Sequence, residues 1–298
     1  MRWKRLSILL LVFASVWTCA GTDEGRQRRV DLGGHALFAS IYGSGTPLVV
    51  VDVGFGDSWT HWEPVLQRLS RHTRCLAYDR AGYGRSDPGP MPRHSRQVAR
   101  ELRELLTALS VDDPVVLVGH SLGGLNAEVF AAEYPDRVAG LVLLDPPPRD
   151  WLQGKTFPRL RRTALDETAN MLRAAQNATA AGEDRRANFL KTLASEHKQM
   201  LTVGAVQTAA LKDFKNIPLL VMGAGRPDPR FGTDAAAFRE YWNAQSRRLA
   251  ARSSRGVFLP APNCSHNLYR DDPDLVLNAI LRVLRLVRRG NAARDDGG

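Results

Sequence analysis

Short apolar runs rich in β-branched residues alternate along this chain with segments of helical spacing. Clear examples are residues 48–53, 115–118 and 138–144, each of which is nearly unbroken by polar residues. Such runs are typical of strands buried on both faces of a parallel sheet, because a sheet with one solvated face shows polar residues at alternate positions instead. Strands that alternate with helices predict an α/β fold, in which helices flank a mostly parallel sheet.

By this criterion the chain contains eight predicted strands. They lie at residues 28–32, 36–42, 48–53, 75–78, 115–118, 138–144, 217–222 and 256–260. Residues 149–214 interrupt the alternation after the sixth strand, because they are rich in Ala, Arg and Thr and contain no strand run. We therefore predict a core of residues 28–148 and 215–288, a helical cap at 149–214, and a disordered tail at 289–298. The cap is expected at the carboxyl edge of the sheet, where ligand sites of α/β folds lie.

Residues 1–20 have the pattern of an export signal. A basic start precedes the apolar run 8–17, which is too short to span a bilayer comfortably, and small residues follow it. Simple cleavage before Gly21 is the first interpretation. The second makes Cys19 the lipid-modified first residue of a lipoprotein, and the third is an uncleaved anchor or no export. We predict an exported bacterial protein, periplasmic, secreted or lipid-anchored, whose contact with a membrane would be a lipid on Cys19.

Composition argues against several other classes of protein. Hydrophobic residues make up 44% and charged residues 24% of the chain, which is an ordinary globular balance. The three cysteines include no CxxC pair, so neither a zinc ribbon nor a redox dithiol is predicted. The net charge of +10 would suit an anionic partner, but most basic residues are scattered and no nucleic-acid-binding motif accompanies them. We therefore expect no metal and no nucleic-acid partner.

The segment Gly119-His120-Ser121-Leu122-Gly123 joins a predicted buried strand to a predicted helix. In this setting the pattern GxSxG is typical of a nucleophile elbow, in which a sharp turn holds the serine above the sheet. Gly119 and Gly123 are the elbow glycines, because a side chain at either position would clash in so tight a turn. The backbone N–H of Leu122 then points to the place where an oxyanion forms, at a helix N-terminus. We predict that Ser121 is a catalytic nucleophile.

A serine nucleophile requires a base and an acid that orients the base. His266 follows the last predicted strand, so it reaches the same edge of the sheet as Ser121 and is the predicted base. His120 is adjacent to the nucleophile, and its side chain is expected to point away from the site. Two aspartates, Asp145 and Asp228, follow buried strands at this edge, and the residues alone leave both open as the acid.

Taken together, these features resemble the α/β-hydrolase-fold serine hydrolases, esterases and lipases among them, over residues 30–288. The resemblance is carried by four segments: the Gly-rich loop after strand 48–53, the segment 79–87 (DRAGYGRSD), the elbow 119–124 (GHSLGG) and the late pair 265–266. The chain departs from the family in the first of these, where a frequent His-Gly is replaced by Val53-Gly54-Phe55-Gly56.

The resemblance implies an α/β-hydrolase fold with the chain order nucleophile, acid, histidine. It favours Asp228 as the acid, at the usual Gly-x-x-Asp position, whereas some relatives use the position of Asp145. It also implies that Phe55 supplies a second oxyanion N–H, and that Arg80, with its neighbours in segment 79–87, orders a loop beneath the site. Neither a metal nor an organic cofactor is implied.

We therefore expect a serine hydrolase that cleaves an ester, or an amide, lactone or thioester, of a small acyl substrate through an acyl-enzyme. The alternative is a non-catalytic protein of the same fold that binds a ligand or a partner. The cap arginines either form a solvated helix face or meet an anionic acyl group; they are Arg159, Arg161, Arg162, Arg173, Arg185 and Arg186. The sequence leaves the oligomeric state open.

Overall fold

The computed structural model describes residues 25–204, 207 and 213–295 of the 298-residue chain. The predicted export signal and Cys19 lie outside these residues, so export and lipid attachment stay predictions. Within the described ranges, no helix is both long enough and apolar enough to cross a membrane.

The predicted eight-stranded, mostly parallel sheet is confirmed. In spatial order it runs β1-β2-β4-β3-β5-β6-β7-β8, and only the pairs β1–β2 and β2–β4 are antiparallel. The strands are β1 (Arg26–Asp31), β2 (Ala36–Tyr42), β3 (Val49–Asp52), β4 (Cys75–Asp79), β5 (Val115–His120), β6 (Val138–Leu144), β7 (Leu219–Ala224) and β8 (Gly256–Ala261).

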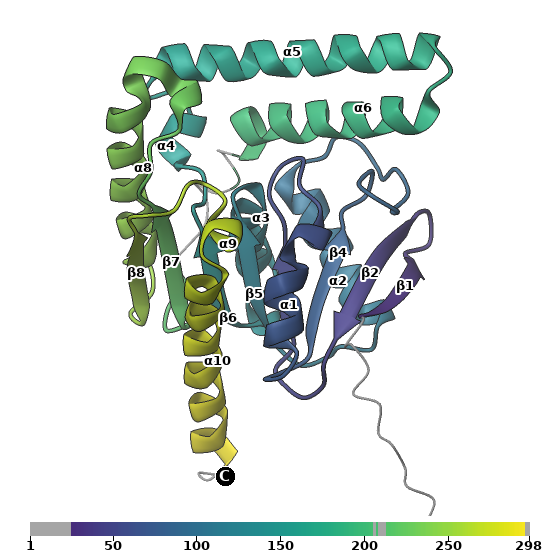
Figure 1. Cartoon of the computed structure of the whole chain (residues 1–298). Coiled ribbons are helices and arrows are strands. Elements are labelled where there is room, and N and C mark those ends of the chain that lie inside the picture. The colour runs from purple at the N-terminus through teal and green to yellow at the C-terminus, as the bar shows by residue number, and fades with distance from the viewer. Residues whose placement is uncertain (1–24, 205–206, 208–212, 296–298) are drawn as a thin grey trace, which may run out of the picture.

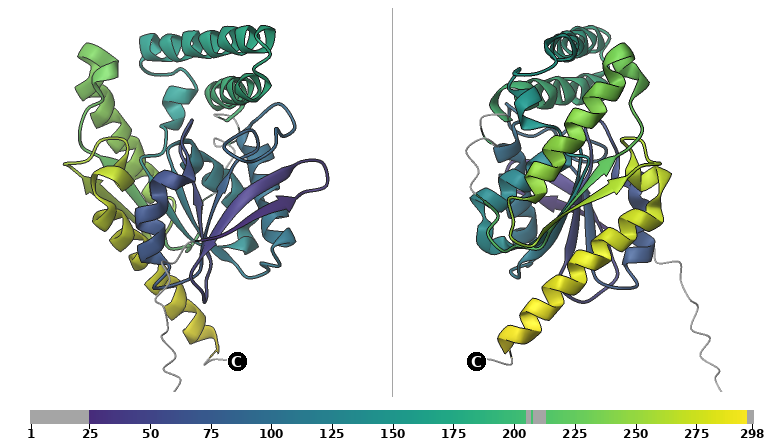
Figure 2. Two further views of the ribbon diagram at one scale, coloured as in Figure 1. Left: turned by 45° about the vertical axis from the view of Figure 1, so that its right-hand side comes forward. Right: turned by 90° about the vertical axis from the view of Figure 1, so that its left-hand side faces the viewer.

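Helices cover both faces of this sheet, which explains why its central parallel strands are largely apolar (Figures 1 and 2). On β3, Val49 and Val51 pack into one buried cluster and Val50 packs into the other, because successive side chains point to opposite faces. The first cluster includes side chains of α1 (Glu63–Leu69) and α10 (Pro273–Asp295), and the second those of α2 (Ser95–Ala108), α3 (Leu122–Glu133) and α8 (Ala235–Ala250).

The prediction of a disordered tail at 289–298 is wrong for residues 289–295, because α10 continues to Asp295. Ala and Arg, which are good helix formers, outweigh the single Gly290 in this stretch. The helix is also attached to the core at the preceding turn, where the Arg288 side chain donates to the backbone carbonyls of Thr46 and His72.

Between β6 and β7 the chain forms the helices α4 (Arg149–Leu152), α5 (Pro158–Ala180) and α6 (Asp184–Gln199). The two long helices make an antiparallel pair above the carboxyl edge of the sheet, and α6 lies between α5 and the core (Figure 1). The short α9 (Leu268–Asp271) follows β8 at the same edge. Loops, cap and carboxyl strand ends therefore meet in one region of the molecule.

Candidate active site

Ser121 occupies a sharp turn between β5 and α3. Its backbone has φ 52° and ψ −119°, a conformation that residues other than glycine rarely adopt and that is found at functional turns. A Cβ on Gly119 would lie 2.4 Å from the carbonyl oxygen of Gly123, and one on Gly123 would lie 2.1 Å from the carbonyl oxygen of Asp52. Only glycine fits at both positions, so the local sequence explains how the turn closes.

Asp145, the first residue after β6, is the carboxylate that meets the histidine. Its Oδ2 lies 2.6 Å from Nδ1 of His266, so the ring N–H donates to it. The same fully buried carboxylate accepts two bonds from Nη1 of Arg239, at 2.7 and 3.0 Å, and one from the N–H of Ala224 at 3.2 Å. Burial raises the pKa of Asp145, but the contacts with His266 and Arg239 outweigh burial and hold it below its usual value.

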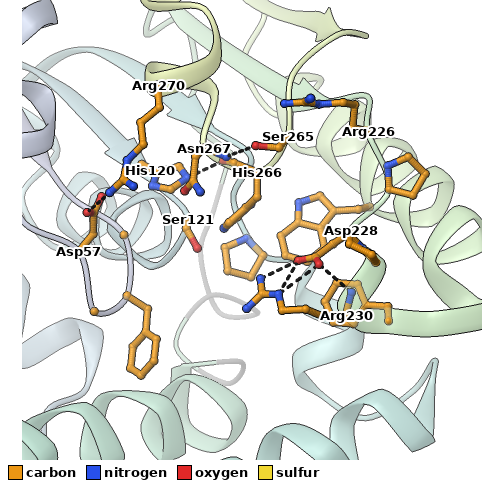
Figure 3. Close-up of a pocket in the computed structure, with 18 of the residues that line it drawn as sticks. Asp57, His120, Ser121, Arg226, Asp228, Arg230, Ser265, His266, Asn267 and Arg270 are labelled. Atoms are coloured by element: carbon orange, nitrogen blue, oxygen red, sulfur yellow. Dashed lines mark hydrogen bonds and ion pairs between the residues drawn. The ribbon is translucent and has the colours of Figure 1, made fainter.

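Asp228, the acid that the resemblance favours, does not make this contact. It precedes the turn Pro229–Asp234, and its Oδ1 accepts the N–H of Arg230 at 3.0 Å. Its carboxylate also accepts from the Arg230 side chain, with Oδ2 at 2.6 Å from Nη2 (Figure 3). The preference for Asp228 is therefore corrected: the carboxylate at this position caps its own turn, and the structure brings the alternative, Asp145, to His266.

The side chain of His120 does not point away from the site, contrary to expectation. Its Nε2–H donates to the backbone carbonyl of His266 at 2.8 Å, and so anchors the loop that carries the predicted base. Its ring packs edge-on against Tyr269, which stacks on Trp62 at 4.4 Å between ring centroids. Burial, together with the charge of His266, lowers the pKa of His120 to about 3, which keeps the imidazole neutral.

The two predicted oxyanion donors come from separate segments of the chain. Leu122 is the first residue of α3, where backbone N–H groups have no intrahelical acceptor and the helix dipole favours negative charge. Phe55 lies on the loop after β3 and lines the same pocket as Ser121. The next residues of this loop are tied to the segment after His266, since Asp57 accepts from Tyr269 at 2.6 Å.

The pocket has a volume of about 590 Å³, and the side chains of Ser121 and His266 project into it (Figure 3). Its apolar wall combines residues of the cap and the core, namely Phe55, Trp151, Met200, Phe231 and Trp242. Its rim carries three arginines, each paired with an aspartate: Arg226 with Asp271, Arg230 with Asp228 and Arg270 with Asp57. The rim is therefore polar, but its positive charges are balanced by neighbouring carboxylates.

The cap arginines do not enter this pocket. Five of the six are exposed to solvent, and the half-buried one, Arg161, donates to the backbone carbonyl of Leu201 at 2.8 Å. Their exposure favours the solvated helix face for the five exposed arginines. Among the residues that the structure describes, no group of three or more His, Cys, Asp or Glu side chains is placed to hold a metal ion.

His197, on α6, lines the pocket, although no sequence signal indicated it. Its ring stacks on that of Phe55 at 5.1 Å between centroids, and its Nδ1 lies 2.9 Å from Oγ1 of Thr168 on α5. Burial lowers the pKa of His197 to about 4, so the ring is neutral near pH 7. His197, Phe55 and Thr168 come from three separate segments, which local sequence patterns do not relate to one another.

Because two histidines are buried and neutral, we expect the folded protein to lose stability in acid. His197 and His120 stay neutral in the folded state, whereas an unfolded chain protonates its histidines near pH 6.5. Because both folded pKa values are lowered, the unfolded state binds more protons below pH 6.5. The free energy of unfolding therefore falls between about pH 6.5 and 4, by at most about 1.4 kcal/mol per pH unit for each histidine.

Urea unfolding of the wild type and of His197→Gln across this pH range measures the effect. We expect a shallower decline in His197→Gln, and an unchanged decline in His72→Gln, which substitutes an exposed histidine. Equal slopes in the wild type and His197→Gln would contradict the assignment of His197 as a neutral buried group.

Comparison with known proteins agrees with this fold. A family model described as "Alpha/beta hydrolase family" matches residues 48–279. The uncharacterized protein YqjL of Bacillus subtilis is 30% identical over 241 residues, which cover 81% of this chain and 85% of that protein. A 2-(acetamidomethylene)succinate hydrolase of Mesorhizobium japonicum is 35% identical over 124 residues, 42% of this chain and 44% of that protein. Among solved structures, a thermophilic esterase from Thermogutta terrifontis superimposes with a TM-score of 0.63 at 23% identity, covering 88% of this chain and 99% of that one.

Proposed function

The chain belongs to the alpha/beta hydrolase family, and from this premise we propose that it is a serine hydrolase acting on an ester, or on an amide, lactone or thioester, of a small molecule. The observation that carries the proposal is the contact of 2.6 Å between His266 and Asp145, beside a pocket that Ser121 and His266 both line. These three side chains have the roles of nucleophile, base and orienting acid in acyl transfer.

In the proposed reaction, Nε2 of His266 takes the proton of Ser121 while Oγ attacks the substrate carbonyl. Because Asp145 accepts the Nδ1–H, the lone pair is on Nε2, which can then take the serine proton, and the carboxylate stabilises the imidazolium that forms. The backbone N–H groups of Phe55 and Leu122 hold the oxyanion of the tetrahedral intermediate.

Collapse of the tetrahedral intermediate releases the leaving group, and His266 donates to it the proton that came from Ser121. Water then attacks the acyl-enzyme, with the same imidazole as base, and regenerates Ser121. The substrate sits in a pocket with an apolar wall and a polar rim, which suits a small molecule with an apolar acyl or leaving group.

Labelling with a fluorophosphonate tests this proposal, since the reagent reacts with activated serines. We expect stoichiometric modification of Ser121 in the folded protein, located by peptide mass spectrometry, and none in Ser121→Ala. Denatured protein is the control, because the reaction requires the assembled triad. A folded protein that is not labelled would instead support the alternative, a non-catalytic protein that binds a ligand or a partner.

A panel of p-nitrophenyl esters of graded acyl length then sizes the acyl pocket, with amide, lactone and thioester substrates measured beside it. The preferred bond is the one with the largest kcat/KM.

A further inference from the structure

The Gly54–Phe55 peptide is held from beneath by the buried side chain of Arg80. Nη2 of Arg80 donates to the carbonyl oxygen of Gly54 at 3.1 Å, and Nη1 donates to that of Val53 at 2.6 Å. The Gly54 oxygen also accepts a longer bond of 3.4 Å from the N–H of Asp57. In a trans peptide the carbonyl oxygen and the following N–H point in opposite directions. The contact therefore turns the Phe55 N–H away from Arg80, and so sets the direction of the proposed oxyanion donor.

The position of Arg80 depends in turn on Glu196, which helix α6 of the cap supplies. Nε and Nη2 of Arg80 donate to the two carboxylate oxygens of Glu196 at 3.0 and 3.2 Å, and Nη1 donates to Asp52 at 2.7 Å. All three side chains are at least 94% buried, so water does not replace either carboxylate. Burial alone would lower the pKa of Arg80, but the charge of Glu196 is the main cause that holds the pKa of Arg80 well above its usual value.

Glu196 reaches the same loop by a second route. Its Oε2 accepts the hydroxyl of Tyr83 at 2.5 Å, and the oxygen of that hydroxyl accepts the N–H of Gly56 at 3.1 Å. Burial and the charge of Glu196 raise the pKa of Tyr83, so the hydroxyl stays protonated and donates. Phe55 thus lies between two positions whose backbone groups are both tied to Glu196.

Glu196 belongs to a face of α6 that packs on the loop after β4. Phe189, Thr192 and Glu196 follow one another at spacings of three and four residues, so they share one side of the helix. The ring of Phe189 meets that of Tyr83 edge-on, with centroids 5.6 Å apart. Thr192 occupies the space beside Gly82, where an added Cβ would lie 2.1 Å from the threonine hydroxyl. This packing holds the carboxylate of Glu196 in place.

We propose that Glu196 is a positioning residue for the oxyanion hole, and that the cap thereby supports the chemical step as well as enclosing the substrate. The inference rests on the proposed serine hydrolase function. In Glu196→Gln a single amide oxygen replaces the two carboxylate oxygens, and the amide NH2 group repels the donors of Arg80 or Tyr83 that it meets. The guanidinium then shifts towards Asp52, so the Gly54–Phe55 peptide is no longer held in one orientation. A misdirected Phe55 N–H weakens binding of the oxyanion, which exists only after attack, and leaves ground-state binding almost unchanged.

The test compares Glu196→Gln with a matched control, Glu128→Gln. Glu128 is a buried glutamate of α3 that also joins core to cap, but its ion-pair partner is Arg149 of α4 rather than a group beneath the loop. For Glu196→Gln we expect kcat on a p-nitrophenyl ester to fall about tenfold, with KM within about twofold. This is smaller than the loss of a whole oxyanion donor, about 10²-fold or more, because the donor is misdirected rather than removed. In Glu128→Gln, kcat stays within about twofold.

The rate constant of fluorophosphonate labelling is a second readout, because the phosphoryl oxygen occupies the oxyanion hole in that reaction too. It should fall in Glu196→Gln by a similar factor. Tyr83→Phe, which removes only the hydroxyl between Glu196 and Gly56, should show a smaller loss of kcat. If Glu196→Gln fails to fold, the loss of kcat in Tyr83→Phe tests the inference instead.

Two results would overturn the inference, and only the first of them leaves the serine hydrolase function standing. If Glu196→Gln and Tyr83→Phe change only KM, as expected for a group that merely docks the cap, Glu196 has no part in positioning the oxyanion hole. If the wild type is neither labelled at Ser121 nor active on any ester, the serine hydrolase function itself is refuted, and the inference with it.

Discussion

Ser121→Ala and His266→Ala are each expected to lower kcat/KM by about three orders of magnitude or more, with the fold intact. Without Ser121 no acyl-enzyme forms, and without His266 the hydroxyl keeps its proton and is a poor nucleophile. The oxyanion donors and the pocket remain in both variants, so some rate enhancement over water should persist. Hydrolysis rates of the best p-nitrophenyl ester, with circular dichroism spectra of each variant, measure the effect.

The double variant distinguishes a triad from two independent contributions. Because nucleophile and base act as a unit, removing both should cost little more than removing one. Ser254→Ala, a substitution at an exposed serine outside the pocket, should keep wild-type turnover. Wild-type rates in either Ser121→Ala or His266→Ala would show that a different residue carries the reaction.

Asp145→Asn is expected to lower kcat by about 10³- to 10⁴-fold, whereas Asp228→Asn stays within about tenfold. An asparagine amide at 145 donates to Nδ1 of His266, which forces the proton onto Nε2 and leaves no lone pair for the serine proton. The carboxylate of Asp228 accepts hydrogen bonds from the Arg230 side chain, so loss of its charge disturbs the rim of the pocket rather than the triad.

Asp145→Asn also removes the charge that balances the buried Arg239, so some loss of stability is expected. Glu101→Gln is the matched control, since Glu101 is equally buried and pairs with the buried Arg93. It should lower the melting temperature without a comparable loss of turnover. If instead Asp228→Asn is the variant that loses activity, the assignment of the acid to Asp145 is wrong.

Much of the fold is predictable because its information is local. A strand covered by helices on both faces is apolar at nearly every position, so β3, β5 and β6 stand out as apolar runs. The cap is recognisable in the same way, as a stretch without strand runs. The end of α10 is not, since helix propensity beyond residue 288 is modest and the attachment of Arg288 to Thr46 and His72 lies far away in sequence.

Within the site, the sequence predicts Ser121 and its turn but does not predict the direction of the His120 side chain. Gly119 and Gly123 report directly on the turn at Ser121, because the close backbone contacts that exclude a side chain are part of the turn itself or of the adjacent strand. His120 is different: its expected direction followed from adjacency to Ser121, whereas its actual partner is the backbone of His266, 146 residues away.

Sequence alone predicts the order of strands and helices, the elbow with its serine, and the histidine after the last strand, because each depends on residues that are neighbours in the chain. The folded structure is needed to see which aspartate meets His266, and that Glu196 of the cap meets Arg80 under the loop of Phe55. Both carboxylates after β6 and β7 reach the same edge of the sheet, and spacing along the chain does not distinguish them. What distinguishes them is which partners lie within hydrogen-bond distance once the loops are folded: Arg230 holds Asp228, while Arg239 and Ala224 hold Asp145 against the ring.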